Sequence, residues 1–164
     1  MPSSEQNITK DRYMLIPRTV IFVRKGDGYL LIKGADSKKL WAGKYNGLGG
    51  HVERREDVIS SARRELFEEA GISADLWLCG TVIVDVDDIG ICLFVICGEN
   101  VQGEIIESKE GKAEWIKKES IPELPAVEDL PVLLNKIDSM NKNDPPFSAR
   151  LFYEDGKLKI IFST

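Results

Sequence analysis

The sequence has few cysteines, a single histidine, no excess of basic residues and no long apolar run. Its cysteines, Cys79, Cys92 and Cys97, are odd in number, lie in apolar surroundings and form no C-x-x-C pair. This pattern predicts buried, reduced thiols rather than a zinc or redox site. No apolar run reaches the roughly 18–20 residues of a membrane-spanning helix, and residues 1–13 are too polar for a signal-peptide core. We therefore expect a cytoplasmic protein that binds no membrane.

Basic residues are fewer than acidic ones, 22 against 27, which gives a net charge of -5. Proteins that bind DNA or RNA polymers draw much of their affinity from clustered Lys and Arg, so we expect no such partner here. A small polyanionic substrate would instead need metal ions to offset its charge. The chain has 164 residues, of which 43% are hydrophobic. This is enough for one domain, 1–164, that is stabilised by its own core.

Apolar, β-branched runs alternate with turn residues and with two helical patterns. The predicted strands are 14–23, 29–33, 76–86, 89–97, 113–116, 151–153 and 158–162. Residues 57–70 place apolar side chains at three- and four-residue intervals before Gly71, and a second helix is predicted over roughly 127–140. Residues 35–50 have neither periodicity, which is typical of a long functional loop. Because the strands and helices do not alternate as βαβ units, the predicted fold class is α+β.

The first helix carries three glutamates, Glu65, Glu68 and Glu69, at positions that share one helix face. They lie toward its C-terminal end, where the helix dipole disfavours negative charge. A bound cation would offset that cost, and Mg²⁺ prefers carboxylate oxygens, with water and substrate phosphates as its other ligands. The alternative is a solvated acidic face, relieved by neighbouring Arg63 and Arg64.

The residues around these glutamates read Gly50-x5-Glu56-x7-Arg64-Glu65-Leu66-x-Glu68-Glu69-x-Gly71-Ile72. This segment, 50–72, resembles the Nudix box at every fixed position, and the chain is identified on it as a member of the Nudix hydrolase family. The resemblance implies an α+β fold in which a mixed sheet is sandwiched between helices. It also implies hydrolysis of a nucleoside diphosphate that is linked to another group.

The same resemblance implies roles for the residues of the box. The metal ligands would be the Gly49 carbonyl and the carboxylates of Glu65, Glu68 and Glu69, with Mg²⁺, or alternatively Mn²⁺, as the ion. Glu65 and Glu68 would act in catalysis together with Arg64, which would orient Glu65 through a charge-assisted hydrogen bond. Glu56 would support the loop rather than bind the metal directly.

Beyond the box, the chain is similar to the branch of 8-oxo-dGTP diphosphatases. Residues 42–50 resemble the segment that leads into the box in that branch, where Asn46 would contact the base. An amide offers both a donor and an acceptor to a purine edge, although Asn46-Gly47 is also a common turn dipeptide. Residues 107–110 resemble a downstream loop in which Glu110 would be a further metal ligand or the base. Glu110 could also be an ordinary surface glutamate.

Other positions differ from that branch where the substrate would be selected. Leu40 replaces an expected aromatic residue and has Trp41 beside it, so both are candidates for contact with the base. Glu128 and Asp129 lie near the expected base-reading acids, but capping of the second helix explains them equally well. His51 would contact a phosphate or simply pack against its neighbours.

These features predict a Mg²⁺-dependent nucleoside triphosphate pyrophosphohydrolase that acts on oxidised purine nucleotides such as 8-oxo-dGTP. A hydrolase of ADP-ribose, a nucleotide sugar or a dinucleoside polyphosphate would use the same box, because surrounding loops select the rest of the substrate. A module that binds a nucleotide without hydrolysing it is a third possibility. The expected partner is a small-molecule nucleotide, and the sequence leaves monomer and homodimer open.

Overall fold

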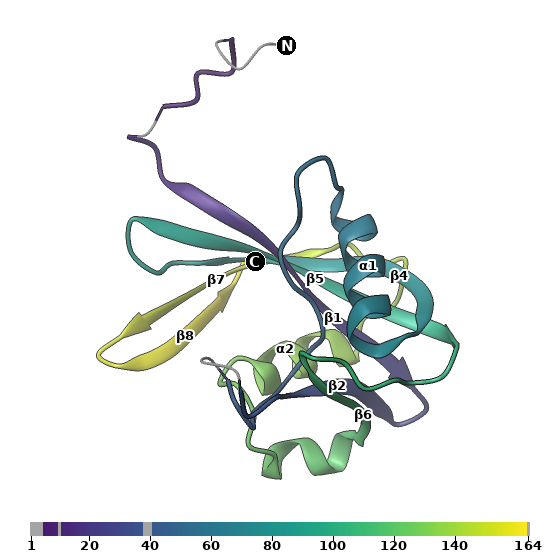
Figure 1. Ribbon diagram of the computed structural model, residues 1–164. Coiled ribbons are helices and arrows are strands. Elements are labelled where there is room, and N and C mark those ends of the chain that lie inside the picture. The colour runs from purple at the N-terminus through teal and green to yellow at the C-terminus, as the bar shows by residue number, and fades with distance from the viewer. Residues whose placement is uncertain (1–4, 10, 38–40, 164) are drawn as a thin grey trace.

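The computed structural model describes residues 5–9, 11–37 and 41–163, and its centre is a single mixed β-sheet (Figure 1). The strands are β1 (Met14–Lys25), β2 (Gly28–Gly34), β3 (Tyr45–Asn46), β4 (Ser73–Val84), β5 (Ile89–Gln102), β6 (Gly111–Lys117), β7 (Phe147–Glu154) and β8 (Lys157–Phe162). Their order in the sheet is β3-β2-β1-β5-β4-β7-β8, and β6 pairs with β2.

Two parallel pairs bring distant parts of the chain together. β1 pairs in parallel with β5, and β4 pairs in parallel with β7, whereas the remaining pairs are antiparallel. The predicted hairpins are present: β1 turns into β2 through Gly26 and Asp27, and β7 turns into β8 through Asp155 and Gly156. The last hairpin therefore lies against β4, far from its place in the sequence.

Helices cover both faces of the sheet, as Figure 1 shows. On β1, Val20 and Phe22 join the core under α2 (Leu130–Asp138), whereas Ile21 and Val23 join the core under α1 (Val58–Ala70). This alternation follows from the period of two along a strand. The α+β class and the sheet sandwiched between helices are thereby confirmed.

The first helix begins and ends where the sequence predicts. Asp57 caps it by accepting hydrogen bonds from the backbone N–H groups of Ile59 and Ser60. Gly71 ends it with a φ of 70°, a left-handed conformation that suits glycine. These two residues fix the length of the helix that carries the glutamates.

Other elements differ from the prediction. The second helix starts at Leu130 rather than near residue 127, and a short 3-10 helix, Lys118–Glu123, precedes it. The predicted loop 35–50 contains the short strand β3, which pairs with β2. The 3-10 helix begins with a hydrogen bond from the Lys118 N–H to the Asp27 carbonyl, and β3 depends on its pairing with β2. Hydrophobic periodicity does not register such contacts.

The prediction of three reduced thiols is wrong. Cys79 and Cys97 lie on the neighbouring strands β4 and β5 and form a disulfide, and Cys92 is the free cysteine. A shift in strand register between Leu78 and Gly80 lies at Cys79. The spacing of the cysteines in the sequence gives no sign of this strand pairing, so the disulfide could not be anticipated.

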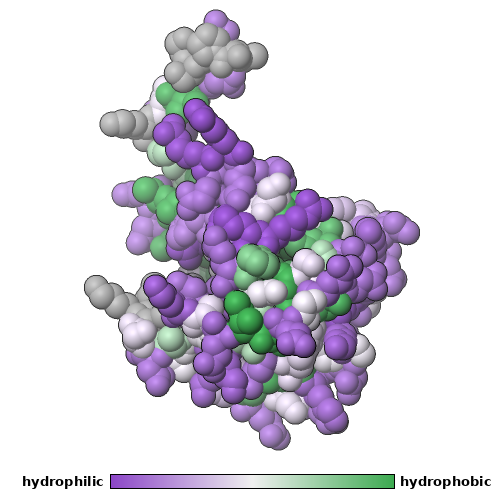
Figure 2. Space-filling model, turned by 45° about the vertical axis from the view of Figure 1, so that its right-hand side comes forward, coloured by the Kyte–Doolittle hydropathy of each residue, from purple (hydrophilic) through white to green (hydrophobic). Residues whose placement is uncertain are grey.

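The surface seen in Figure 2 is largely hydrophilic, with hydrophobic residues in scattered patches. Charged residues make up 30% of the chain, which agrees with this view. Within the described residues, no helix is both long enough and apolar enough to cross a membrane.

Candidate functional site

The loop before α1 runs along β1. Leu48 exchanges backbone hydrogen bonds with Ile21, and the Thr19 N–H donates to the Gly50 carbonyl at 2.8 Å. Gly49 has a φ of 133°, and a side chain there would collide with the Thr19 backbone. Glycine is therefore required at position 49 for the loop to lie this close to the strand.

Two box glutamates face this loop from α1. The Glu69 carboxylate accepts a hydrogen bond from the Gly49 N–H at 2.7 Å, and Glu69 is only 5% exposed. The Glu65 carboxylate lies against Gly50, at the position that a Cβ on residue 50 would occupy. Glu65 and Glu69 therefore both face the Gly49–Gly50 segment of the loop.

Arg64 holds the box together through several carboxylates. Its guanidinium donates to Glu65 at 2.7 Å, to both oxygens of Glu56 at 2.9 Å and to Glu68 at 3.2 Å. It also donates to the His51 carbonyl oxygen at 3.0 Å. The predicted contact from Arg64 to Glu65 is confirmed, and Glu56 contacts Arg64 and the loop.

These contacts shift the pKa values of Glu56 and Arg64. The hydrogen bonds from Arg64, followed by that from the Glu53 backbone N–H, lower the pKa of Glu56 to about 2. The hydrogen bonds to Glu56 and Glu65 raise the pKa of Arg64 above its ordinary value. Both groups are therefore fully charged at neutral pH, and the box loop is tied to the helix by an ion pair.

The predicted metal ligands do not form a closed cage. Within the described part of the chain, no group of three or more His, Cys, Asp or Glu side chains is arranged to hold a metal ion. The Glu68 side chain is 58% exposed and points to Arg64, and Glu110 is exposed on the turn before β6. Glu110 shares a small cleft of about 70 Å³ with Gly49 and Glu69.

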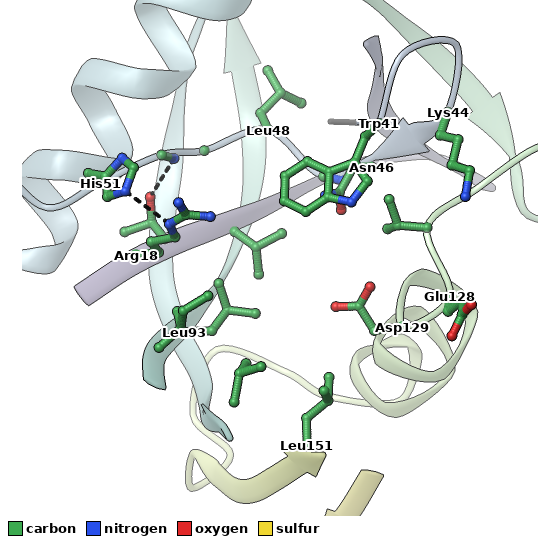
Figure 3. Close-up of a pocket in the computed structure, with 18 of the residues that line it drawn as sticks. Arg18, Trp41, Lys44, Asn46, Leu48, His51, Leu93, Glu128, Asp129 and Leu151 are labelled. Carbon is green, nitrogen blue, oxygen red and sulfur yellow. Dashed lines mark hydrogen bonds between the residues drawn. The ribbon is translucent and has the colours of Figure 1, made fainter. Parts of the chain in front are cut away.

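A larger pocket of about 480 Å³ opens on the side of the sheet that α2 covers (Figure 3). Its apolar wall includes Val20, Val84, Ile91, Leu93, Leu151 and Leu158. The residues that line both this pocket and the small cleft are Trp41, Lys44, Asn46, Gly47, Gly49 and Glu110. The two cavities therefore meet at the loop that leads into the box.

Asn46 lines the pocket and also has the role expected of a turn residue. Its side-chain oxygen accepts a hydrogen bond from the Gly47 N–H at 2.8 Å. This bond fixes the amide group and leaves its NH₂ group as the donor for a ligand. The two interpretations of Asn46 are therefore compatible.

The acidic pair before α2 lines the same pocket. Asp129 occupies the N-cap position of α2, yet its side chain makes no capping hydrogen bond. In Figure 3 its carboxylate projects into the pocket, whereas Glu128 lies further out. Burial, with a smaller effect from the Glu128 charge, raises the pKa of Asp129 above its ordinary value. Side-chain capping is therefore not the role of Asp129.

Two other predicted residues also line this pocket. Trp41 is 48% exposed, and its indole lies across the pocket in Figure 3. His51 lies on the opposite side from Asp129, where its Nε2 accepts a hydrogen bond from Arg18 at 3.1 Å. Leu40 lies outside the described residues.

Several lining residues were missed in the sequence. Arg18 comes from β1 and Lys44 from the loop, and Leu151, Tyr153 and Leu158 come from the final hairpin. The hairpin reaches the pocket only because β7 pairs in parallel with β4. No local pattern signals such a contact.

The family is settled by comparison with known sequences. The model of the NUDIX domain matches residues 14–136. The chain belongs to the NUDIX family, as its box and its sandwiched mixed sheet indicate.

Named relatives narrow the branch. Oxidized purine nucleoside triphosphate hydrolase of Danio rerio is 33% identical over 97 residues, which cover 56% of this chain and 61% of the relative. The enzyme of the same name from Mus musculus is 30% identical over 108 residues, or 63% of this chain and 67% of the relative. The match to the zebrafish protein thus spans less than two thirds of its length.

Solved structures share the fold of this chain. The MutT protein from Bacillus halodurans superimposes with a TM-score of 0.77 at 25% identity, covering 90% of this chain and 97% of that one. The MutT NUDIX hydrolase from Burkholderia pseudomallei has the same fold, with a TM-score of 0.66 at 21% identity over 76% of this chain and 98% of its own. The protein is a Nudix hydrolase of the MutT-like branch.

Proposed function

We propose that this protein hydrolyses oxidised purine nucleoside triphosphates, such as 8-oxo-dGTP, to the monophosphate and pyrophosphate in a Mg²⁺-dependent reaction. The observation that carries the proposal is the shared pocket of Asn46 and Asp129, which meets the cleft of Glu69 and Glu110. A nucleotide whose base lies at one end of this pocket would have its phosphates near the box. The names of the zebrafish and mouse relatives support the same substrate class.

The polar groups suit an oxidised purine. Oxidation at the imidazole ring replaces an acceptor with an N–H donor, and a carboxyl group such as Asp129 can accept from that donor. The fixed NH₂ group of Asn46 can donate to a ring carbonyl. Trp41 and the apolar wall provide a surface for the base plane.

The residues present fit a hard divalent ion, and Nudix hydrolases generally use one. The Gly49 carbonyl, Glu65 and Glu69 would hold Mg²⁺, or Mn²⁺, with Glu68 and Glu110 as further oxygen donors. Among the described residues, no N–H donates to the Gly49 carbonyl oxygen. Mg²⁺ commonly takes few protein carboxylates and leaves positions for water and phosphate oxygens, which agrees with an open site. When bound, the ion neutralises phosphate charge and acidifies the attacking water.

The chain's own residues orient the reaction. Arg64 holds the Glu65 carboxylate toward the loop, and the Gly49 N–H holds Glu69. Glu110 accepts the proton of the attacking water, a role supported by its place beside Glu69 and Gly49. The pyrophosphate then leaves without a covalent intermediate on the enzyme.

A substrate panel tests this function. Steady-state kinetics on 8-oxo-dGTP, dGTP, ATP and ADP-ribose, with pyrophosphate and phosphate release measured separately, should give the highest kcat/KM for 8-oxo-dGTP. Greater efficiency on ADP-ribose than on every triphosphate would reject the proposed substrate and favour the alternative class. Absence of hydrolysis on the whole panel, extended to a nucleotide sugar and a dinucleoside polyphosphate, would favour a binding module.

A further inference from the structure

Arg18 is a half-buried cation that lines the large pocket. No acidic side chain of the described residues forms a salt bridge with it. Its hydrogen bond is from Nε to the His51 imidazole at 3.1 Å, which fixes the guanidinium and uses one of its five N–H donors. The terminal NH₂ groups therefore remain for a ligand.

Two groups of polar side chains lie on different sides of this pocket, which Lys44 and Glu110 also line. Figure 3 shows Arg18 and His51 on one side and Asp129 and Glu128 on the other, with apolar residues such as Leu93 between them. A nucleotide that places its base near the carboxyl groups would have its phosphates repelled from that side. The opposite side offers the positive charge of Arg18, which would attract them.

The cationic side is also the side next to the box. Arg18 forms a backbone bridge with His51, and the next residue, Thr19, donates its N–H to the Gly50 carbonyl at 2.8 Å. Gly50 in turn lies against the Glu65 carboxylate. Arg18 therefore lies close to the start of the box, whereas Lys44 lines the small cleft together with Glu69.

We infer that Arg18, held by the His51 imidazole, binds the phosphate chain of the nucleotide and sets its direction in the pocket. The inference rests on the proposed function in taking the Asp129 side as the side of the base. A guanidinium presents a planar fork of N–H donors that matches two oxygens of one phosphate. His51 is then a positioning residue, because it acts through Arg18.

Among the described residues, the other lysine or arginine that lines the pocket is Lys44, which is exposed and lies on the side of Glu128. It is the competing candidate for the phosphate chain. A matched control is Arg150, an exposed arginine on β7 that lies outside this pocket.

The test measures binding without metal, so that turnover does not enter. The variants Arg18→Gln, Arg18→Lys, Lys44→Gln and Arg150→Gln are titrated in EDTA with inorganic tripolyphosphate, 8-oxo-deoxyguanosine and a non-hydrolysable α,β-methylene nucleoside triphosphate. Losing charge-assisted hydrogen bonds should raise the Kd of Arg18→Gln for both phosphate ligands by about tenfold or more. Its Kd for the nucleoside should stay within about twofold of wild type.

Arg18→Lys should lie between wild type and Arg18→Gln, because a lysine keeps the charge but loses the fork. Arg150→Gln should match wild type. Equal losses for nucleoside and triphosphate in Arg18→Gln would overturn the inference, as would a phosphate-dependent loss confined to Lys44→Gln.

The proposed function and the role of Arg18 can fail independently of each other. An enzyme that prefers ATP or ADP-ribose in the substrate panel would not be a hydrolase of oxidised nucleotides. Its Arg18→Gln variant should still lose tripolyphosphate affinity. Unchanged tripolyphosphate affinity in that variant, with hydrolysis of 8-oxo-dGTP intact, would reject the role of Arg18 alone.

Discussion

The Glu69 carboxylate accepts a hydrogen bond from the Gly49 N–H at 2.7 Å, twenty residues away in the sequence. This contact joins the last turn of α1 to the loop that runs along β1. It holds the Glu69 carboxylate at the residue whose carbonyl would also bind the metal. Glu69 is therefore buried, whereas a helix-surface glutamate in this sequence pattern would be expected to be exposed.

Glu69→Gln should lower turnover by about 10²-fold or more, the scale of losing several kcal/mol of electrostatic stabilisation. The amide oxygen of glutamine can still accept the Gly49 N–H, so the variant should fold. Steady-state kinetics at saturating Mg²⁺, together with thermal unfolding, checks both statements. Turnover within a few-fold of wild type would show that the box is not the catalytic site.

Asp87→Asn is the control for that experiment. Asp87 lies in the turn between β4 and β5, outside the large pocket and the small cleft. Its substitution should leave turnover unchanged. A large loss in this variant would mean that the acidic turn takes part in the chemistry.

Gly50→Ala should reduce turnover with little loss of stability. The added methyl group would collide with the Glu65 carboxylate, which is the end of a flexible side chain and can rotate away. Moving that carboxylate disturbs the metal site while the backbone remains acceptable to alanine. We expect a drop in turnover of about tenfold or more, since small displacements at a reacting centre have large effects. Arg63→Gln, an exposed change on the same helix, should have wild-type kinetics.

Local patterns predicted the parts of the fold that depend on neighbouring residues. The helix between Asp57 and Gly71 and the hairpin of β1 and β2 follow from capping, periodicity and turn residues. The Arg64–Glu65 contact was implied by the resemblance to the Nudix box.

The residues that line the pocket could not be predicted from the sequence, because they are brought together by long-range strand pairing. Arg18 faces Leu93 across the parallel β1–β5 pair, in which the partners are more than seventy residues apart. Leu151 reaches the pocket through the β4–β7 pair. The composition of the pocket depends on register between distant strands, and periodicity specifies a buried face without specifying its partner.

Glu56→Gln should lower the stability of the folded protein at neutral pH and have a smaller effect on stability in acid. Arg64 and the Glu53 N–H lower the pKa of Glu56 from 4.5 to about 2. The folded state therefore binds fewer protons than the unfolded state in this range. The stabilisation is full above a pH of about 4.5 and is lost as the pH falls toward about 2.

Thermal unfolding of wild type and Glu56→Gln across this pH range measures the effect. The difference in Tm should be largest near neutral pH and should shrink steadily below pH of about 4.5. A difference that stays constant into acid would contradict the ion pair as its source.

Reduction of the Cys79–Cys97 disulfide should lower the free energy of unfolding. The bond joins residues 18 apart, and closing a loop of this size stabilises a protein by about 3 kcal/mol. Chemical denaturation with and without reductant measures the change. Alkylation of the denatured protein, followed by mass spectrometry, should modify Cys92 alone before reduction and all three cysteines afterwards. Three modified cysteines in the unreduced protein would rule out the bond.

Asn46→Ala should narrow the preference for 8-oxo-dGTP over dGTP by selectively weakening the preferred substrate. Its NH₂ group and the Asp129 carboxyl form one set of donors and acceptors in the pocket, and a purine with the wrong pattern leaves them unpaired. Removing the amide should lower kcat/KM for 8-oxo-dGTP by about tenfold or more and that for dGTP by less. Because the variant leaves Glu65 and Glu69 in place, its response to Mg²⁺ concentration should match wild type. Asn100→Ala, which removes an exposed amide bonded to Asp75, should keep the wild-type ratio. An equal loss on both substrates in Asn46→Ala would show that the amide supports the loop through Gly47 and does not select the base.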